Sequence, residues 1–475
     1  MLLIEEEAMR EKIHVTNEIG KLKSLLINVP NGGTQYIPPA LQRELLYDDI
    51  VDYQVMRHEY ASFHETLLWF LDPLVAKNLS CDDDVRMLQL DPYREEYLRS
   101  DKVIDVAYLL SHCLEDKQVR HAVTHAVCAH ERVPLVTLKK LEQLSPLQLC
   151  QTLLTGCFDQ KMLFPPIPNL LFTRDLGVVI ENLMACMVFK KNVRSREALL
   201  LQYLACHGLK ISQDSLLQIE YHGWASSSPM PSIEGGDVMM ISPEHLLVGR
   251  SERTNGVAIE SLFRKVNEQT RVNKVSVIDI PKERGCMHID TLFTQLKRDT
   301  WAVYGPVSQP QNTGPSIEEY FNEGPAQNKH AVCQQFSMQG DVIVKNRDFS
   351  SLQELLTSVS KDDFGSSKCR FIYCADQDPY QESREQWTDA CNFLALDEGV
   401  VLGYERNRLT NQALENNGFS VLRAGELNKQ LRQGASLETL IKGDTLIIIP
   451  SAELSRARGG SHCMSFPLTR EDLQS

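Results

Sequence analysis

Short segments rich in β-branched and aromatic residues, each bounded by turn residues, recur along the 475-residue chain. They alternate with amphipathic stretches, such as 195–207 and 410–417, that have helical periodicity. This alternation is typical of an α/β protein. We expect strands at 23–29, 176–180, 238–241, 246–248, 275–280, 301–304, 370–373, 393–396, 400–403 and 445–449.

Two regions depart from this alternation. Residues 81–157 have nearly continuous helical periodicity, with helix starts at Asp82 and at Ser145-Pro146. We interpret them as an inserted helical bundle, so that 14–80 and 158–475 form the α/β domain. Residues 309–345 contain repeated Gly-Pro and Gln-Pro turns, which predict a long loop or flap. No sequence repeat of fixed period is present.

The charge balance and the cysteines narrow the class of protein. The chain has 49 Lys and Arg against 63 Asp and Glu, a net charge of −14, which disfavours nucleic acid or an anionic membrane as partner. No apolar run approaches the roughly 20 residues that cross a bilayer, and the acidic Glu5–Glu7 run is unlike a signal or transit peptide. Thirteen cysteines without a secretory signal therefore indicate free thiols and a cytoplasmic location.

Cys463 is the first candidate for chemistry. It follows Gly459, Gly460, Ser461 and His462 near the end of the chain. Glycines allow a backbone to approach a ligand closely and to present one thiol at the end of a strand. The alternative is that Cys463 is a buried free cysteine without a catalytic role. Residues elsewhere in the chain are needed to distinguish the two roles.

Two further clusters contain carboxylates. His288 and Asp290 are two residues apart, so on a strand they would point to the same face and share a cavity. Glu234 and Asp237 flank a pair of glycines directly before an apolar run, at a predicted strand entrance. Each of these residues, taken alone, could equally be a satisfied structural group.

A third cluster follows the proline-rich turn at 165–168. Asn169 and Asp175 place an amide and a carboxylate six residues apart. Asp175 could also have only a structural role, paired with a neighbouring basic group.

Two chemical interpretations compete for these residues. One is a metal site, because Cys, His and carboxylate are zinc ligands; it would use Cys286, His288, Asp290, His462 and Cys463. Their spacing does not match a compact zinc motif, and no Cys-x-x-Cys pair lies nearby. The other has a cysteine nucleophile, a histidine acid and base, and carboxylates around a guanidinium group, which they can bind in bidentate fashion.

With these residues, the sequence resembles the arginine deiminases, guanidine-modifying enzymes of the pentein fold. The matching motifs follow the family order over nearly the whole chain: 17–23, 46–50, 168–175, 234–237, 251–254, 287–291, 384–387, 403–407 and 458–464. The resemblance implies an α/β propeller of five ββαβ-like modules around a central active site, with an inserted helical bundle. It also implies a homo-oligomer, a dimer or tetramer, without cofactor or metal.

The resemblance implies the following catalytic roles. Cys463 attacks the guanidinium carbon of free L-arginine and forms an S-alkylthiouronium intermediate, which water hydrolyses to L-citrulline after ammonia has left. His288 protonates the ammonia and then activates the water, supported by Glu234. Asp175 and Asp290 bind the remaining guanidinium nitrogens.

Other positions correspond to residues that bind the amino-acid end of the substrate. Arg194, Arg253 and Arg458 match positions that hold the α-carboxylate, and Asn169 matches one at the same end. The chain departs from the family at Ser461, where a third glycine is common, and at Leu176, where proline is common. Neither departure removes a catalytic residue.

Two alternatives to arginine hydrolysis remain. Related enzymes act on agmatine, on methylated arginine or by amidino transfer, and share the core. Agmatine has no carboxylate, so the three arginines favour free arginine. A non-catalytic arginine-binding protein is the second alternative, although a pure binder needs no thiol at 463.

Overall fold

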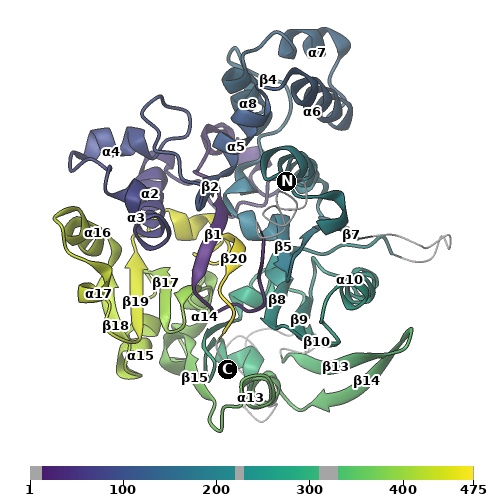
Figure 1. Cartoon of the computed structure of the whole chain (residues 1–475), viewed down its shortest axis with the longest axis vertical. Coiled ribbons are helices and arrows are strands. Elements are labelled where there is room, and N and C mark those ends of the chain that lie inside the picture. Colours follow the sequence, from purple (N-terminus) through teal and green to yellow (C-terminus); the bar gives the residue numbers. More distant parts are fainter. Residues whose placement is uncertain (1–12, 220–228, 310–329, 474–475) are drawn as a thin grey trace, which may run out of the picture.

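The computed structural model describes residues 13–219, 229–309 and 330–473. Glu5–Glu7 and residues 310–329 of the predicted loop lie outside the described residues. The described chain forms an α/β fold, as the alternation of segments predicts (Figure 1). Of its helices, none is both long enough and apolar enough to span a bilayer.

Five of the sheets share one connectivity, in which an antiparallel pair is extended by a parallel strand. Two of them are β5 (Gly177–Ile180), β6 (Leu183–Cys186) and β7 (Leu216–Gln218), and β8 (Val238–Ser242), β9 (His245–Arg250) and β10 (Lys274–Asp279). The next two are β11 (Phe293–Lys297), β12 (Thr300–Val303) and β15 (Arg370–Tyr373), and β16 (Leu394–Asp397), β17 (Val400–Tyr404) and β19 (Thr445–Ile449) with β18 (Ser420–Arg423) at the edge.

The fifth sheet joins the two ends of the described chain. β20 (Phe466–Arg470) pairs antiparallel with β1 (Leu22–Ile27), which pairs in parallel with β2 (Val103–Asp105). The purple β1 and the yellow β20 lie side by side near the centre of Figure 1. The residues just before β20 are thereby held close to the first strand. A small hairpin, β3 (Cys157–Phe158) and β4 (Lys161–Met162), stands apart from these sheets.

The helices lie between and around the strands. Their bounds are α2 Tyr53–Leu71, α3 Pro73–Ala76, α4 Asp83–Gln89, α5 Val106–Cys113, α6 Lys117–His130, α7 Leu135–Leu141, α8 Pro146–Thr155, α9 Ser195–Tyr203, α10 Gly256–Gln269, α11 Gly305–Ser308, α13 Leu352–Asp362, α14 Glu382–Trp387, α15 Arg408–Asn416, α16 Ala424–Arg432 and α17 Leu437–Leu440. In Figure 1, α5 to α8 gather at the top of the molecule, above the sheets.

Helix starts follow the capping residues that the sequence indicates. Asp82 caps α4, because its carboxylate accepts the N–H of Val85. Ser145 and Gln148 form a reciprocal capping box at the start of α8, where Pro146 occupies the first turn. Both predicted starts are therefore confirmed.

Two expectations about the elements are wrong. The described part of the predicted loop at 309–345 contains β13 (Val332–Gln339) and the first residues of β14 (Val342–Phe349), and these two strands form a hairpin that extends the sheet of β10. The predicted helical periodicity of 81–157 is interrupted by β2, which pairs with β1. A three-residue strand leaves too little pattern in the sequence to be recognised.

Candidate active site

Cys463 lies in a tight turn between the 3₁₀ turn Leu454–Ala457 and β20. Its backbone N–H donates to Asn392 Oδ1 at 3.0 Å, and only 4% of the residue is exposed. The preceding glycines are required by close approach. A Cβ at Gly459 would overlap the ring of Phe172, and one at Gly460 would come within 2.6 Å of Asn392 Oδ1. The glycine pair therefore does what the sequence suggested, although in a turn and not at the end of a strand.

His288 is held by two carboxylates. Its Nε2 lies 3.1 Å from Glu234 Oε2 and its Nδ1 lies 3.5 Å from Asp175 Oδ1. Glu234 stands at the entrance of β8, as predicted, and the following turn brings Gly236 against the imidazole. A Cβ at Gly236 would come within 2.6 Å of His288 Nδ1. Glycine at position 236 therefore leaves space for the imidazole of His288 between the carboxylates of Glu234 and Asp175.

The expected strand through His288 and Asp290 is wrong. His288 is extended, but Ile289–Thr291 form a 3₁₀ turn, so the two side chains do not alternate along a strand. Asp290 Oδ2 instead contacts His462 Nδ1 at 2.9 Å and Cys463 Sγ at 3.5 Å. Both side chains still reach the same site, because a Cβ at Gly236 would lie within 3.1 Å of Asp290 as well as close to His288.

The charges set the protonation of the thiol and the imidazole. Burial alone would lower the pKa of His288, but three carboxylates outweigh it and raise this pKa to about 10; they belong to Asp175, Asp237 and Glu234. Burial raises the pKa of Cys463 well above its usual value, and neighbouring carboxylates raise it further. Without a ligand, His288 is therefore a cation and Cys463 a neutral thiol at neutral pH.

Glu234 is the carboxylate that pairs with this cation. Burial alone would raise its pKa, but the hydrogen bond from His288 and the charges of Arg253 and Arg194 lower it to about 2. Arg253 Nη1 lies 3.5 Å from Glu234 Oε1, and Arg194 Nη1 lies 4.0 Å from Glu234 Oε2. The carboxylate is therefore ionised at neutral pH.

Arg194 also contacts the other acid of the site. It forms an ion pair with Asp175, and its Nε and Nη2 donate to Glu197 Oε2 at 3.0 and 2.7 Å. Its Nη2 further donates to the carbonyl of Asn169 at 3.1 Å. The Asn169 side chain donates to the carbonyl of Leu45 at 2.7 Å. The structure thus joins these residues in one buried network.

Arg458 borders the site from the opposite side. It has a left-handed backbone, with φ 68°, and its guanidinium carbon lies 3.5 Å from the centre of the Trp387 ring. Its Nη2 donates to the carbonyl of Arg284 at 3.2 Å. Burial disfavours the charged form of Arg458 and lowers its pKa. An anion bound beside this guanidinium would therefore stabilise its buried charge.

A small cavity of about 20 Å³ lies between these side chains. It is lined by Asn169, Asp175, Arg194, Arg253, His288, Arg458 and Cys463, together with Leu46, Phe172, Arg284, Met287, Thr291 and Ala457. Three buried polar atoms of its lining residues lack hydrogen-bond partners among the described residues: the acceptor Asp175 Oδ1 and the donors Arg253 Nε and Arg458 Nη1. Since unpaired buried groups are costly, the site suits a ligand that offers both donors and an acceptor.

The five residues of the alternative zinc set do not share one centre. Cys286 Sγ contacts Glu283 Oε1 at 3.4 Å, whereas His462 and Cys463 contact Asp290. Asp175, Glu234 and His288 do place ligand-type atoms within 4.8 Å of one another. Two guanidinium groups, from Arg194 and Arg253, already lie beside that trio and would repel a dication.

Sequence reasoning missed two residues that hold the site together. Asn392 accepts from the Cys463 N–H, and its Nδ2 donates to the carbonyl of Asp290 at 3.0 Å. Glu18 Oε2 lies 3.3 Å from His462 Nε2, and its Oε1 pairs with Arg174. Glu18 falls within a motif of the family resemblance at 17–23, which could have identified it, whereas no local pattern singles out Asn392.

The chain is similar in sequence to known proteins over nearly its whole length. The family model of arginine deiminase matches residues 43–470. The arginine deiminase of Treponema denticola is 29% identical, covering 97% of this chain and 99% of that protein. The arginine deiminase of Listeria monocytogenes strain EGD-e is 27% identical, covering 98% of this chain and 100% of that protein.

Among solved structures the likeness is weaker. An amidinotransferase from Microseira wollei superposes with a TM-score of 0.47 at 13% identity, covering 98% of this chain and 99% of that one. A dimethylarginine dimethylaminohydrolase superposes with a TM-score of 0.37 at 16% identity, covering 63% and 76%.

Proposed function

The chain belongs to the arginine deiminase family, and from this premise we propose that it hydrolyses free L-arginine to L-citrulline and ammonia. The observation that carries the proposal is the cavity beside the Cys463 thiol. Its unpaired acceptor, Asp175 Oδ1, suits a guanidinium, and its unpaired donors on Arg253 and Arg458 suit a carboxylate. Free arginine carries both groups on one short chain.

In the first half of the reaction, Cys463 Sγ bonds to the guanidinium carbon. The thiol is neutral in the resting site, and the bound cation lowers the cost of its thiolate by direct attraction. The thiol proton passes to solvent as the bond forms, and the sulfur regains a proton when the thiolate leaves at the end of the reaction. His288 gives its proton to the nitrogen that leaves as ammonia, and the C–N bond breaks. The product is a covalent S-alkylthiouronium on Cys463.

In the second half, water replaces the sulfur. His288 is now neutral and takes a proton from the water, whose oxygen bonds to the same carbon. The C–S bond breaks, the thiolate leaves, and citrulline is formed. Glu234 keeps the imidazole oriented through their contact at 3.1 Å. These steps need no metal and no cofactor.

Substrate binding uses the charged network around the cavity. Asp175 and Asp290 bind the guanidinium nitrogens, and Arg194, Arg253 and Arg458 bind the α-carboxylate, with Asn169 at the amino-acid end. A volume of about 20 Å³ holds about one water molecule, so side chains must move to admit arginine. The ion pair between Arg194 and Asp175 is one contact that a bound guanidinium would compete with.

Membership of the arginine deiminase family also supports proposals about the fold, the oligomeric state and the cellular location of the protein. We propose a pentein-type propeller in which the five similarly connected sheets are the modules. Residues 14–80 and 158–475 are the catalytic domain, and 81–157 are an inserted helical part that contributes the strand β2 to one module. A homo-oligomer, a dimer or tetramer, is proposed from the family. All 13 cysteines are free thiols, which supports a cytoplasmic location. We expect neither nucleic acid nor an anionic membrane as partner, because the net charge of the chain is −14.

The test is citrulline formation from free arginine by the purified protein, with agmatine and a peptidyl arginine as control substrates. Agmatine lacks the carboxylate and peptidyl arginine has it in an amide, so both should have much lower kcat/KM values than arginine. The Cys463→Ala variant should form no citrulline. Equal kcat/KM values for arginine and agmatine would show that the three arginines do not bind a carboxylate, and no citrulline from any substrate would reject the function.

A further inference from the structure

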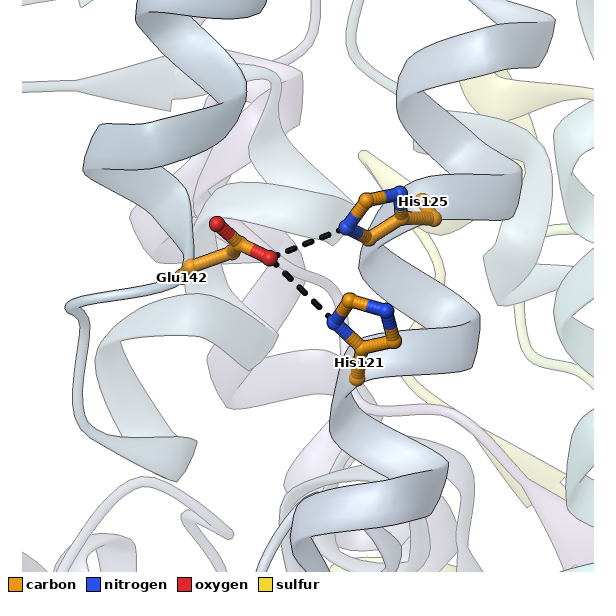
Figure 2. Close-up of side chains that lie close together, drawn as sticks. All are labelled: His121, His125 and Glu142. Atoms are coloured by element: carbon orange, nitrogen blue, oxygen red, sulfur yellow. Dashed lines mark hydrogen bonds and ion pairs between the residues drawn. The ribbon is translucent and has the colours of Figure 1, made fainter.

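A second group of potential ligands lies on the helical part of the chain, remote in sequence from the residues of the candidate active site. His121 and His125 are one helical turn apart on α6, and Glu142 is the residue directly after α7. Figure 2 shows both imidazole rings and the carboxylate pointing toward one another. Residues four apart on a helix share a face, so the spacing of the histidines itself produces this convergence.

The distances are those of a compact cluster. Glu142 Oε1 lies 3.2 Å from His121 Nδ1 and 2.9 Å from His125 Nε2. The ring centroids are 4.0 Å apart, and one ligand atom from each residue lies within 4.8 Å of the others. In a tetrahedral zinc site with bonds of about 2.0–2.1 Å, neighbouring ligand atoms are roughly 3.3 Å apart. The two distances to the carboxylate thus differ from that requirement by a few tenths of an ångström.

The side chains can adjust to close the remaining gap. Their exposed fractions are 65% for His121, 43% for His125 and 35% for Glu142, so none is locked by packing. Unlike Asp175, Glu234 and His288, this group has no ion pair with an arginine or lysine among the described contacts.

We propose that His121, His125 and Glu142 form a binding site for a divalent transition-metal ion, with Zn²⁺ as the cation that fits best. Two imidazole nitrogens and one carboxylate oxygen are ligands that Zn²⁺ prefers, and water completes the tetrahedron. Calcium and magnesium are disfavoured because they select oxygen ligands. The bound ion would connect α6 to the segment between α7 and α8.

This connection has a defined consequence. The ion would replace the contacts of Glu142 with the two histidines by three bonds to one metal centre. A ligand that binds only the folded state stabilises the folded state. We therefore expect zinc to raise the unfolding temperature of the protein. The inference does not depend on the proposed arginine hydrolysis, because neither histidine lies in the candidate active site.

The experiment is a zinc titration of the metal-stripped full-length protein in competition with a chromogenic chelator. The wild type should bind one more equivalent of Zn²⁺, in the micromolar range or tighter, than the His121→Ala/His125→Ala double variant. Glu142→Gln should weaken this equivalent by at least about tenfold. His112→Ala is the matched control, since His112 is an exposed histidine that pairs with Glu115 alone, at 3.3 Å.

Two further readouts distinguish this site from zinc binding by cysteines and from the candidate active site. Co²⁺ bound by the two histidines and Glu142 should give a tetrahedral spectrum without a thiolate charge-transfer band, whereas Co²⁺ bound by cysteines would show that band. The double variant should form citrulline at the wild-type rate, so loss of zinc binding and loss of catalysis are distinguishable. Equal zinc stoichiometry and affinity in the wild type and the double variant, or a thiolate band from the only bound Co²⁺, would overturn the proposal.

Discussion

At the scale of the residue, the candidate site without substrate contains a protonated imidazole at His288 and a neutral thiol at Cys463. The pKa of His288 is about 10 because carboxylates surround it. Burial disfavours a thiolate at Cys463, and neighbouring carboxylates, of which Asp175 is common to both groups, disfavour it further. A cationic substrate changes this balance, since its charge is attracted to the thiolate and to the acids together. The nucleophile is therefore activated by the molecule it attacks.

The titration of the thiol tests this arrangement. Because burial and neighbouring acids raise the pKa of Cys463 well above its usual value, the free enzyme should contain no Cys463 thiolate at pH 7. The ultraviolet thiolate absorbance of the wild type minus that of Cys463→Ala should stay flat through the range in which an ordinary cysteine ionises, about pH 8.5. A full thiolate difference already at pH 7 would show that the resting site holds an ion pair of thiolate and imidazolium.

The turnover of arginine should also depend on pH through His288. The imidazole must start protonated to deliver a proton to ammonia, so kcat/KM should fall as pH rises through about 10. His288→Gln should lower kcat by several powers of ten while changing arginine binding far less, because the carboxylates and arginines remain. An increase of kcat/KM above pH 10 would contradict the role of His288 as acid.

At the scale of the element, the sequence predicts strands well where the apolar pattern is clear. Each of the ten expected strands coincides with an observed one, and two of the missed strands, β6 and β20, have identifiable reasons. β6 is buried along its whole length and has no alternation of polar and apolar residues. β20 contains Pro467, which normally argues against a strand, but β20 lies at the edge of its sheet, where proline is tolerated.

One short strand continues into a helix through a single buried cap. Asp105 ends β2, and its carboxylate accepts the N–H groups of Ala107 and Tyr108 in α5 and of Val29 after β1, at 2.7, 3.1 and 2.9 Å. Burial raises the pKa of Asp105 to about 7 despite these three donors. The residue therefore connects the central sheet to the helical part.

Replacing this cap should be costly in proportion to its burial. Asp105→Ala leaves three N–H groups without their acceptor and should lower the free energy of unfolding by about 3 kcal/mol or more. Asp116 is the matched control, because it caps α6 through two N–H groups but is exposed. Asp116→Ala should cost only about 1 kcal/mol. Equal losses for the two variants in urea unfolding would contradict this account of Asp105.

At the scale of the whole molecule, the site is assembled from segments far apart in the sequence. Four residues, Glu234, His288, Asn392 and Cys463, each stand shortly before a strand of a different sheet, namely β8, β11, β16 and β20, and β20 brings the last of them to β1. Residue types and motifs identified most of these positions. The distances between them could not be predicted, because they depend on how the sheets are arranged and on contacts such as that of Asn392 with Cys463.

The pairing of β20 with β1 should contribute strongly to the stability of the whole chain. Phe466 is fully buried, pairs with Leu26 and packs against the backbone at Gly177, where a Cβ would come within 3.0 Å of the ring. Phe466→Ala should cost about 4 kcal/mol in free energy of unfolding. Tyr380→Ala, at an exposed aromatic, should cost within about 0.5 kcal/mol. A Phe466→Ala loss as small as that of the control would show that this closure is not important for stability.

The central claim is that Cys463 forms a covalent bond to the guanidinium carbon of arginine. Its most direct test is mass spectrometry of the enzyme mixed with L-arginine and quenched in acid during turnover. The account predicts that the peptide containing Cys463 gains the mass of arginine less ammonia, and that the Cys463→Ala variant neither gains this mass nor forms citrulline. An unmodified Cys463 during turnover, with the added mass on Cys286 or another thiol, would contradict it.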